Sequence, residues 1–215
     1  VELTAVRRDG TPLPVEVLVS PLSIDGKTIF SAFLHDITER KQVEAIREHE
    51  ATHDPLTGLL NRRGMFDLLS QAIARVKRTR ASLALLFIDL DGFTQINDTH
   101  GHEAGDAVLR EVAARLQASI RQTDTAARLG GDEFTVILEN IKHGIPDANM
   151  LAQKILETLQ HPIQLDSVTA TISASIGISM HHPYDERSAD QLVNAADSAM
   201  YTAKHAGKNQ VCVHK

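Results

Sequence analysis

The sequence lacks the features that accompany disulfides, membrane spans and nucleic-acid binding. Its one cysteine, Cys212, excludes an internal disulfide and fits a reducing compartment. No apolar stretch approaches the ~18 residues that a membrane span requires, and no signal peptide is present. The formal net charge of −6 argues against nonspecific nucleic-acid binding, which needs a basic surface. We therefore expect a cytoplasmic protein with no nucleic-acid partner and no direct membrane contact in this stretch of chain.

The length bounds the number of domains. At 215 residues the chain can bury one good core and a smaller unit. It begins at Val1, without a methionine, and enters strand-like sequence at once. We expect a fragment of a longer protein, and that parent protein could be membrane-anchored.

The most informative residues are Gly130 to Phe134, which read Gly-Gly-Asp-Glu-Phe. They lie between the apolar runs 126–129 and 134–138, so the pattern predicts two strands joined by a tight turn. The glycine pair supplies the positive φ angles of such a turn and lets a ligand approach the backbone closely. Asp132 and Glu133 then place two carboxylates at a rigid hairpin tip. Taken alone, the pattern also fits an ordinary hairpin with a solvated acidic end.

A second acidic cluster follows the apolar run 83–88, which has the profile of a strand buried on both faces. Asp89 and Asp91 come at its end, where carboxylates are costly unless they stay hydrated or bind something positive. Asp89 beside Asp132 would supply the oxygen ligands that Mg²⁺ prefers, with phosphate and water completing the octahedron. The competing interpretation is that Asp89 and Asp91 form a turn or cap a helix.

The rest of the chain predicts an α+β fold in which helices and strands alternate. The expected helices begin after Asn61 and near Gly105, span about 147–159, and run from a capping box at Ser188 and Gln191 to Gly207. The expected strands are 163–165, 169–178 and 211–213.

The first forty residues predict a separate, incomplete sheet. Three β-rich segments cover 1–6, 15–22 and 28–37, separated by the hairpin signals Asp9-Gly10 and Asp25-Gly26. Thr38 is the expected N-cap of a helix over 39–53. Apolar residues in this helix are too few to prove a coiled coil, so it is either a solvated connector or a helix that pairs across a dimer.

Six motifs, in order and at matching spacing over residues 53–212, resemble those of the GGDEF domain, the diguanylate cyclase family. The first forty residues resemble the C-terminal half of a PAS sensor domain. We accordingly expect a partial PAS domain at 1–38, a signalling helix at 39–53 and a GGDEF domain at 54–215. The motifs are Asp54 to Arg63, Phe87 to Phe93, Asn97-Asp98, Gly101-His102 with Gly105-Asp106, Arg128 leading into Gly130 to Phe134, and Ala196-Asp197 through Asn209.

The resemblance implies a palm-like fold, with a central, mostly antiparallel sheet flanked by helices. It also implies the condensation of two GTP into cyclic di-GMP with release of two pyrophosphates. Mg²⁺, or alternatively Mn²⁺, would be held by Asp89, Asp132 and the carbonyl of Leu90, in a two-metal arrangement. Glu133 would bind the second metal or help deprotonate the attacking 3′-hydroxyl, and the sequence leaves both roles open. Asp132, Glu133 and Asp89 are the expected catalytic residues, and the reaction implies a homodimer with one GTP on each chain.

Substrate residues follow from the same resemblance. Asn97 and Asp106, which bracket an expected turn at Gly101, would read guanine, because a carboxylate can accept from N1–H and N2–H₂. Without the resemblance they read as a turn residue and a first-turn helix acid. The residues expected to contact the triphosphate are Gly92, Phe93, Gly130, Gly131, Lys204 and Lys208.

Two positions depart from the family pattern. Thr94 stands where the family usually has lysine, which weakens one phosphate contact. Lys208 replaces the more common arginine and keeps its charge without the bidentate fork.

A third site is implied by Arg121 and Asp124, which end a short way before Gly130. An arginine can bind guanine O6 and N7 while an aspartate accepts from N1 and N2. Their spacing from the glycine pair matches the family's inhibitory site for cyclic di-GMP, so feedback by the product is expected. Outside that context the two residues would form a surface ion pair of little consequence.

Two other functions remain open from the sequence. The chain could be a module that binds cyclic di-GMP at Arg121 and Asp124 without catalysis. It could also be a catalytically weak, GTP-binding regulator of a phosphodiesterase domain beyond Lys215. The intact pair Asp132-Glu133 argues against the first of these, the binding module. Thr94 favours the regulator.

Overall fold

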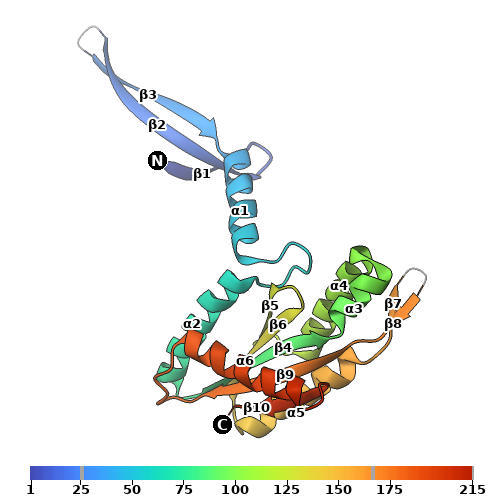
Figure 1. Ribbon diagram of the computed structural model, residues 1–215. Coiled ribbons are helices and arrows are strands. Elements are labelled where there is room, and N and C mark those ends of the chain that lie inside the picture. Colours follow the sequence, from blue (N-terminus) through green and yellow to red (C-terminus); the bar gives the residue numbers. More distant parts are fainter. Residues whose placement is uncertain (25–26, 166–167, 215) are drawn as a thin grey trace. The chain divides into compact units, whose positions relative to one another are not determined.

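The computed structural model describes residues 1–24, 27–165 and 168–214, so the predicted turn at Asp25-Gly26 lies outside the described residues (Figure 1). The chain divides into two compact units, Val1–Glu50 and Ala51–Lys215. Each unit is described by itself below.

The first unit is an antiparallel sheet of three strands in the order β1-β2-β3, as the sequence predicted. The strands are β1 (Glu2–Val6), β2 (Pro12–Ile24) and β3 (Lys27–Asp36). Large apolar side chains remain exposed on it, among them Phe30 and Phe33. A sheet with this much exposed apolar surface lacks a covering layer within the described residues of its own unit.

Helix α1 (Thr38–Thr52) follows the sheet and has no buried residue. Thr38 was predicted to precede the helix as its cap, but it is the first helical residue. The capping oxygen belongs to Asp36, whose Oδ1 accepts hydrogen bonds from the backbone N–H and the hydroxyl of Thr38, at 2.9 and 2.5 Å. An aspartate two positions earlier therefore does what Thr38 was expected to do.

A five-stranded sheet forms the centre of the second unit, in the order β10-β9-β4-β6-β5. Every neighbouring pair is antiparallel except β10 with β9, so the mostly antiparallel α+β fold is confirmed. The strands are β4 (Ser82–Asp91), β5 (Thr125–Gly130), β6 (Glu133–Ile141), β9 (Ser173–His181) and β10 (Gln210–Val213).

Alternate residues of β4 enter two separate hydrophobic clusters, which makes the unit three layers deep (Figure 1). Leu83, Leu85 and Phe87 pack with helices α2 (Arg62–Thr79) and α6 (Ala189–His205). Residues 84, 86, 88 and 90 pack with α4 (His102–Ser119) and α5 (Ile145–Leu159). This is the strand buried on both faces that the apolar run predicted.

Two other predicted helix caps are confirmed. Asn61 precedes α2 and its side chain accepts the N–H of Gly64 at 3.0 Å. The side chains and backbone N–H groups of Ser188 and Gln191 form the reciprocal capping box at the start of α6.

Two predictions of the elements were wrong. The helix expected from about Gly105 starts at His102, and a separate helix, α3 (Phe93–His100), precedes it. The strand expected over 169–178 is broken: β8 (Val168–Ala170) pairs with β7 (Ile163–Leu165), and β9 starts only at Ser173. The N-cap of α3 is Gly92, which has no side chain that could accept a hydrogen bond, so the usual polar signal of a helix start is missing.

Helix α6 lies directly on the backbone of β9. A Cβ atom at Gly177 would be 2.0 Å from the carbonyl oxygen of Ala196 and 2.2 Å from the nitrogen of Met200. Both are backbone atoms and cannot rotate away, so only glycine permits this approach.

Within the described part of the chain, none of the helices has the length and apolar character needed to cross a bilayer.

The loop between β9 and α6 contains a half-buried ion pair that makes stability depend on pH. Hydrogen bonds from Arg187 lower the pKa of Asp185 to about 2, and the Arg187 Nε lies 2.9 Å from the Asp185 Oδ2. A carboxylate with a depressed pKa stabilises the fold above its unfolded pKa, near 4, and that stabilisation disappears as the pH falls toward 2.

We therefore expect Asp185→Asn to lower the free energy of unfolding by about 2 kcal/mol at pH 7 and by about half as much at pH 3, between the two pKa values. Urea unfolding followed by far-UV circular dichroism measures both values. The exposed carboxylate of Asp67 provides a matched control, Asp67→Asn, which should change stability little at either pH. A loss of the same size at pH 3 and pH 7 would contradict the assignment.

Candidate active site

The sheet register brings the two acidic clusters together. Asp89 at the end of β4 lies directly opposite Glu133 at the start of β6. The backbone N–H of Leu90 donates to the carbonyl of Asp132 at 3.2 Å, which fixes the hairpin tip beside the end of β4. Residues that are more than 40 positions apart in sequence thus lie side by side at one end of β4.

Asp89 continues the row of residues 83, 85 and 87, so it faces α6 and is only 6% exposed. Burial raises the pKa of Asp89, and the nearby carboxylates of Asp132 and Asp91 raise it further. Its buried Oδ1 lies 2.8 Å from the Nζ of Lys204 on α6, an ion pair without the alignment of a hydrogen bond. Lys204 is only partly buried, which lowers its pKa, but Asp89, Asp132 and Asp91 outweigh that effect and raise it.

Glu133 has a different cation for a neighbour. Arg62, the first residue of α2, places its Nη2 3.6 Å from the Glu133 Oε2. Burial raises the pKa of Glu133, Arg62 opposes that increase, and Asp197, Asp89 and Asp132 add to it. The carboxylates of Asp89, Asp132 and Glu133 therefore lie close enough to repel one another. A bound cation would relieve this repulsion, as in a metal-binding site.

Side chains alone supply only part of the ligands that a hard divalent cation would need at this site. Among the residues that the structure describes, no three His, Cys, Asp or Glu side chains are arranged to hold a metal ion. Asp89 has a buried oxygen that accepts no hydrogen bond, and Asp132 is near enough for its charge to raise the Asp89 pKa. Two carboxylates fit Mg²⁺ when backbone and phosphate oxygens complete the shell, because this ion takes few protein ligands.

Asp91 is structural. Its carboxylate accepts the hydroxyls of Ser173 and Ser175, at 3.0 and 2.9 Å, and the backbone N–H of Asn209 at 3.0 Å. It ties the end of β4 to β9 and to the loop after α6. In that loop Lys208 and Asn209 both have left-handed backbones, with φ of 61° and 46°.

The first turn of α3 follows β4 immediately. Gly92 has a φ of 82° and precedes the helix, and Phe93 is its first residue. The initial N–H groups of a helix have no intrahelical partner and favour anions. Lys208 is exposed after the C-terminus of α6.

Asn97 and Asp106 lie on two packed helices, α3 and α4. A Cβ at Gly105 would be 1.9 Å from the Asn97 Oδ1, so the amide packs against the first turn of α4. Asp106, the next residue, is half-buried. The structure therefore brings Asn97 to the first turn of α4, which carries Asp106. Asn97 is helical, so the alternative interpretation of it as a turn residue was wrong.

A contact that the sequence did not predict fixes the hairpin from the other side. The Nη1 of Arg128 lies 3.1 Å from both carboxylate oxygens of Asp54. Its Nε and Nη2 donate to the carbonyl of Gly131, at 3.0 and 2.8 Å. Arg128 also donates its backbone N–H to Leu60. We call Arg128, Asp54 and the Gly131 carbonyl the Arg128 bridge. Both side chains lie in motifs that sequence analysis quoted, but no short-range pattern indicates a contact across 74 positions.

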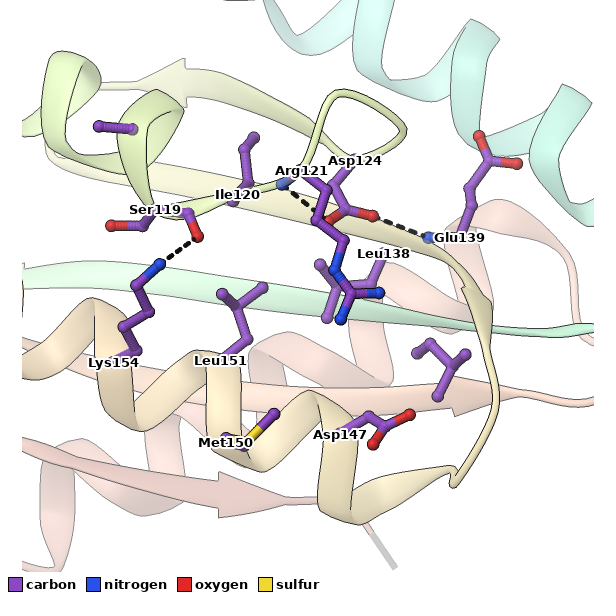
Figure 2. A pocket seen from close by; sticks show the side chains of 12 residues that line it. Ser119, Ile120, Arg121, Asp124, Leu138, Glu139, Asp147, Met150, Leu151 and Lys154 are labelled. Carbon is purple, nitrogen blue, oxygen red and sulfur yellow. Dashed lines mark hydrogen bonds between the residues drawn. The ribbon is translucent and has the colours of Figure 1, made fainter.

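Arg121 and Asp124 lie apart from the carboxylates, in the turn before β5. The Asp124 carboxylate accepts the backbone N–H of Arg121 at 3.1 Å and that of Glu139 at 3.4 Å. The Arg121 side chain extends over a cavity of about 340 Å³ between α4, β6 and α5 (Figure 2). Lys154 lies along the same cavity and donates to the Ser119 carbonyl at 3.0 Å. The Asp124 carboxylate thus bonds to the backbone N–H of Arg121 and not to its guanidinium, which faces the cavity.

Residues 51–210 match the family described as diguanylate cyclase, GGDEF domain, and the chain belongs to this family. It is 45% identical over 162 residues to the bifunctional diguanylate cyclase/cyclic di-GMP phosphodiesterase MucR of Pseudomonas aeruginosa, covering 75% of this chain and 23% of MucR. The curated relatives are much longer: the chain spans about a quarter to a half of them.

Solved structures agree. The GGDEF domain of TpbB from Pseudomonas aeruginosa superimposes with a TM-score of 0.72 at 40% identity, covering 76% of this chain and 94% of that one. The coiled coil and GGDEF domain of DgcB from Caulobacter crescentus, in complex with c-di-GMP, gives a TM-score of 0.74 at 29% identity, covering 81% and 91%.

The Arg128 bridge predicts how the hairpin tip responds to substitution. Arg128→Lys keeps the charge but cannot donate to Asp54 and Gly131 together. Because hydrogen bonds to charged groups contribute about 1.5–3 kcal/mol, we expect the Leu90 amide, which bonds to Asp132, to exchange at least tenfold faster with solvent deuterium. Arg63→Lys, at an exposed position of α2, is the control. An unchanged exchange rate would show that Arg128 does not hold the tip.

Proposed function

We propose that the protein is a diguanylate cyclase, which condenses two GTP into cyclic di-GMP and two pyrophosphates. The observation that carries this proposal is the register that places Asp89 opposite Glu133 and joins Leu90 to Asp132. It gathers the family's acidic motifs at one end of β4, next to the N-terminus of α3 and to Lys204.

The carboxylates of Asp89 and Asp132, with the carbonyl of Leu90, would hold Mg²⁺ or Mn²⁺. The bound ion would neutralise the triphosphate and polarise the α-phosphate. Lys204 now pairs with Asp89, so this lysine is close enough to move from the carboxylate to a phosphate when the ion takes its place. Glu133, beside Arg62, would bind a second ion or accept the proton of the 3′-hydroxyl.

The nucleotide would lie along α3 and the start of α4. Asp106 would accept from N1–H and N2–H₂ of guanine, and Asn97 would serve the neighbouring edge. The N–H groups at Gly92 and Phe93 would face the phosphates, with Gly130 and Gly131 allowing close approach. Lys208 adds a second cation. Thr94, exposed on α3, offers a hydroxyl where a cation would bind more strongly.

Homodimerisation follows from the reaction. One GTP lies on each chain and each 3′-hydroxyl must attack the other α-phosphate, so two copies must face each other. The partial PAS domain at 1–38 and the helix at 39–53 would control that alignment, and we place the protein in the cytoplasm.

A regulatory module remains the second candidate. The similarity to MucR, named as bifunctional, supports a phosphodiesterase domain in the same protein, and Thr94 supports weak turnover. The rate of cyclic di-GMP formation from GTP and Mg²⁺ decides between the two, since a cyclase turns over repeatedly and a regulatory module forms little or no product.

Removal of the hairpin carboxylate should abolish the reaction. Asp132→Ala takes away a proposed metal ligand, so we expect cyclic di-GMP formation from GTP to fall by more than about 100-fold. Chromatography of the products measures it, and circular dichroism should show an unchanged fold. Glu157→Ala, at an exposed position of α5, should remain active. Near-normal product from the Asp132 variant would sink the assignment.

Single substitutions should separate the binding of cyclic di-GMP from catalysis. Arg121→Ala removes the cation above the cavity, and loss of a two-contact guanine site costs about 1–3 kcal/mol, roughly 10- to 100-fold in affinity. We expect weaker binding of cyclic di-GMP by calorimetry, with the rate of product formation kept or raised. Glu133→Ala should show the converse, with turnover lost and binding retained. If Arg121→Ala bound cyclic di-GMP as tightly as the parent, Arg121 and Asp124 would have only a structural role in this turn.

A further inference from the structure

Helix α6 carries a row of exposed side chains beside the candidate active site. Asp197, Tyr201 and His205 are four residues apart, so they form one row along the helix, and all three are exposed. The helix lies across one face of the central sheet, with residues such as Leu192 and Ala199 buried on its inner side (Figure 1). The row is therefore the solvent side of α6.

The centre of this row is an aromatic pair. The ring centroids of Tyr201 and His205 are 4.2 Å apart, and their planes are inclined by 56°. Tyr201 is 60% exposed, although the ring is large and mostly apolar. Tyrosine joins an apolar ring to a hydrogen-bonding hydroxyl, and it is enriched where proteins contact one another. An exposed tyrosine that a neighbouring ring already orients is thus a preformed contact point.

One flank of the row borders the carboxylates of the site. The Nζ of Lys204 lies 2.8 Å from the Asp89 Oδ1, and the charge of Asp197 contributes to the raised pKa of Glu133. Lys204 and Asp197 are seven residues apart, which is about two helical turns, so they lie on the same flank of α6. A molecule that covers the row therefore lies beside both Asp89 and Glu133.

The row is complementary to itself under a two-fold rotation. Asp197 comes four residues before Tyr201, and His205 comes four residues after it. A two-fold axis at Tyr201 that reverses the helix therefore places Asp197 of one copy opposite His205 of a second copy, and does so twice. An imidazole N–H can donate to a carboxylate, and a symmetric dimer needs such a self-complementary surface. Side chains four residues apart also form the ridges by which helices most often pack.

We propose that the row Asp197, Tyr201 and His205 is the surface through which two copies of this chain contact each other, with their α6 helices antiparallel. The inference rests on the proposed function, because joining two nucleotides requires that two sites be opposed. Since the row borders Asp89 and Glu133, the antiparallel contact brings the sites of both copies together. A contact of a few helical turns is small, so the association is weak and transient.

Cross-linking of the full chain tests the contact, in a Cys212→Ser background that leaves no other thiol. Ser198→Cys places a thiol at an exposed position beside the row, and Glu157→Cys, at an exposed position of α5, is the control. Thiols that an interface holds together react at a raised effective concentration, so we expect about tenfold more dimer from Ser198→Cys with a short bismaleimide. Equal yields from the two variants would overturn the proposal.

Charge reversal tests the antiparallel register in the Ser198→Cys chain. His205→Glu sets a second carboxylate opposite Asp197, and Asp197→Arg sets a second donor opposite His205, so each variant alone should cross-link about tenfold less. In an equimolar mixture the new arginine of one variant lies opposite the new glutamate of the other. The yield should then recover to about half of the parent's, because about half of all encounters are mixed.

Glu157→Arg makes a similar change of charge away from the row and should cross-link like the parent chain. A mixture that cross-links no better than either variant alone would overturn the register.

Product formation from GTP is measured on the same variants without the cross-linker. Cross-linking that follows the expected pattern without any cyclic di-GMP refutes the proposed function and leaves the contact surface. Formation of cyclic di-GMP with a cross-linking yield that charge reversal does not change refutes the surface and leaves the proposed function.

Discussion

The contact between α6 and the backbone of β9 at Gly177 is the constraint on which the site depends. Because no Cβ stands between them, the helix lies close enough for Lys204, near its C-terminal end, to reach Asp89 on the adjacent strand. The register of β4 with β6 then fixes Glu133 on the same face. A larger residue at 177 would lift the helix and with it the lysine, although it would touch neither carboxylate.

Crowded carboxylates make this site unstable by itself, and two basic side chains offset the repulsion. Lys204 lies against Asp89 and Arg62 against Glu133. Both cations come from helices on one face of the sheet, whereas the proposed guanine site is built from α3 and the start of α4 on the other side of β4. A triphosphate at the end of β4 would therefore connect the two layers, with its charge on one and its base on the other.

Residues close in sequence were the predictable part of this protein. The hairpin at Gly130-Gly131, the cap at Asn61 and the capping box at Ser188 follow from local chemistry that a sequence displays. Helix α3 was missed because Gly92 caps it without a side chain, and the break before Ser173 has no Gly or Pro to mark it. The Arg128 bridge, the hydrogen bond from the Glu139 N–H to the Asp124 carboxylate and the pairing of Lys204 with Asp89 join segments that are apart in sequence, so only the fold could reveal them.

Two consecutive non-glycine residues, Lys208 and Asn209, hold left-handed backbones that L-residues disfavour by about 1 kcal/mol or more each. Asp91 accepts the Asn209 N–H, Ala203 accepts the Lys208 N–H at 3.1 Å, and Gln160 donates to the Asn209 side chain at 2.6 Å. The backbone that carries the Lys208 side chain is thus immobilised before any anion arrives. A lysine on a free loop would lose backbone entropy when it binds an anion, but here that entropy has already been lost on folding. Lys208 can therefore be exposed and still bind an anion with little further ordering of its backbone.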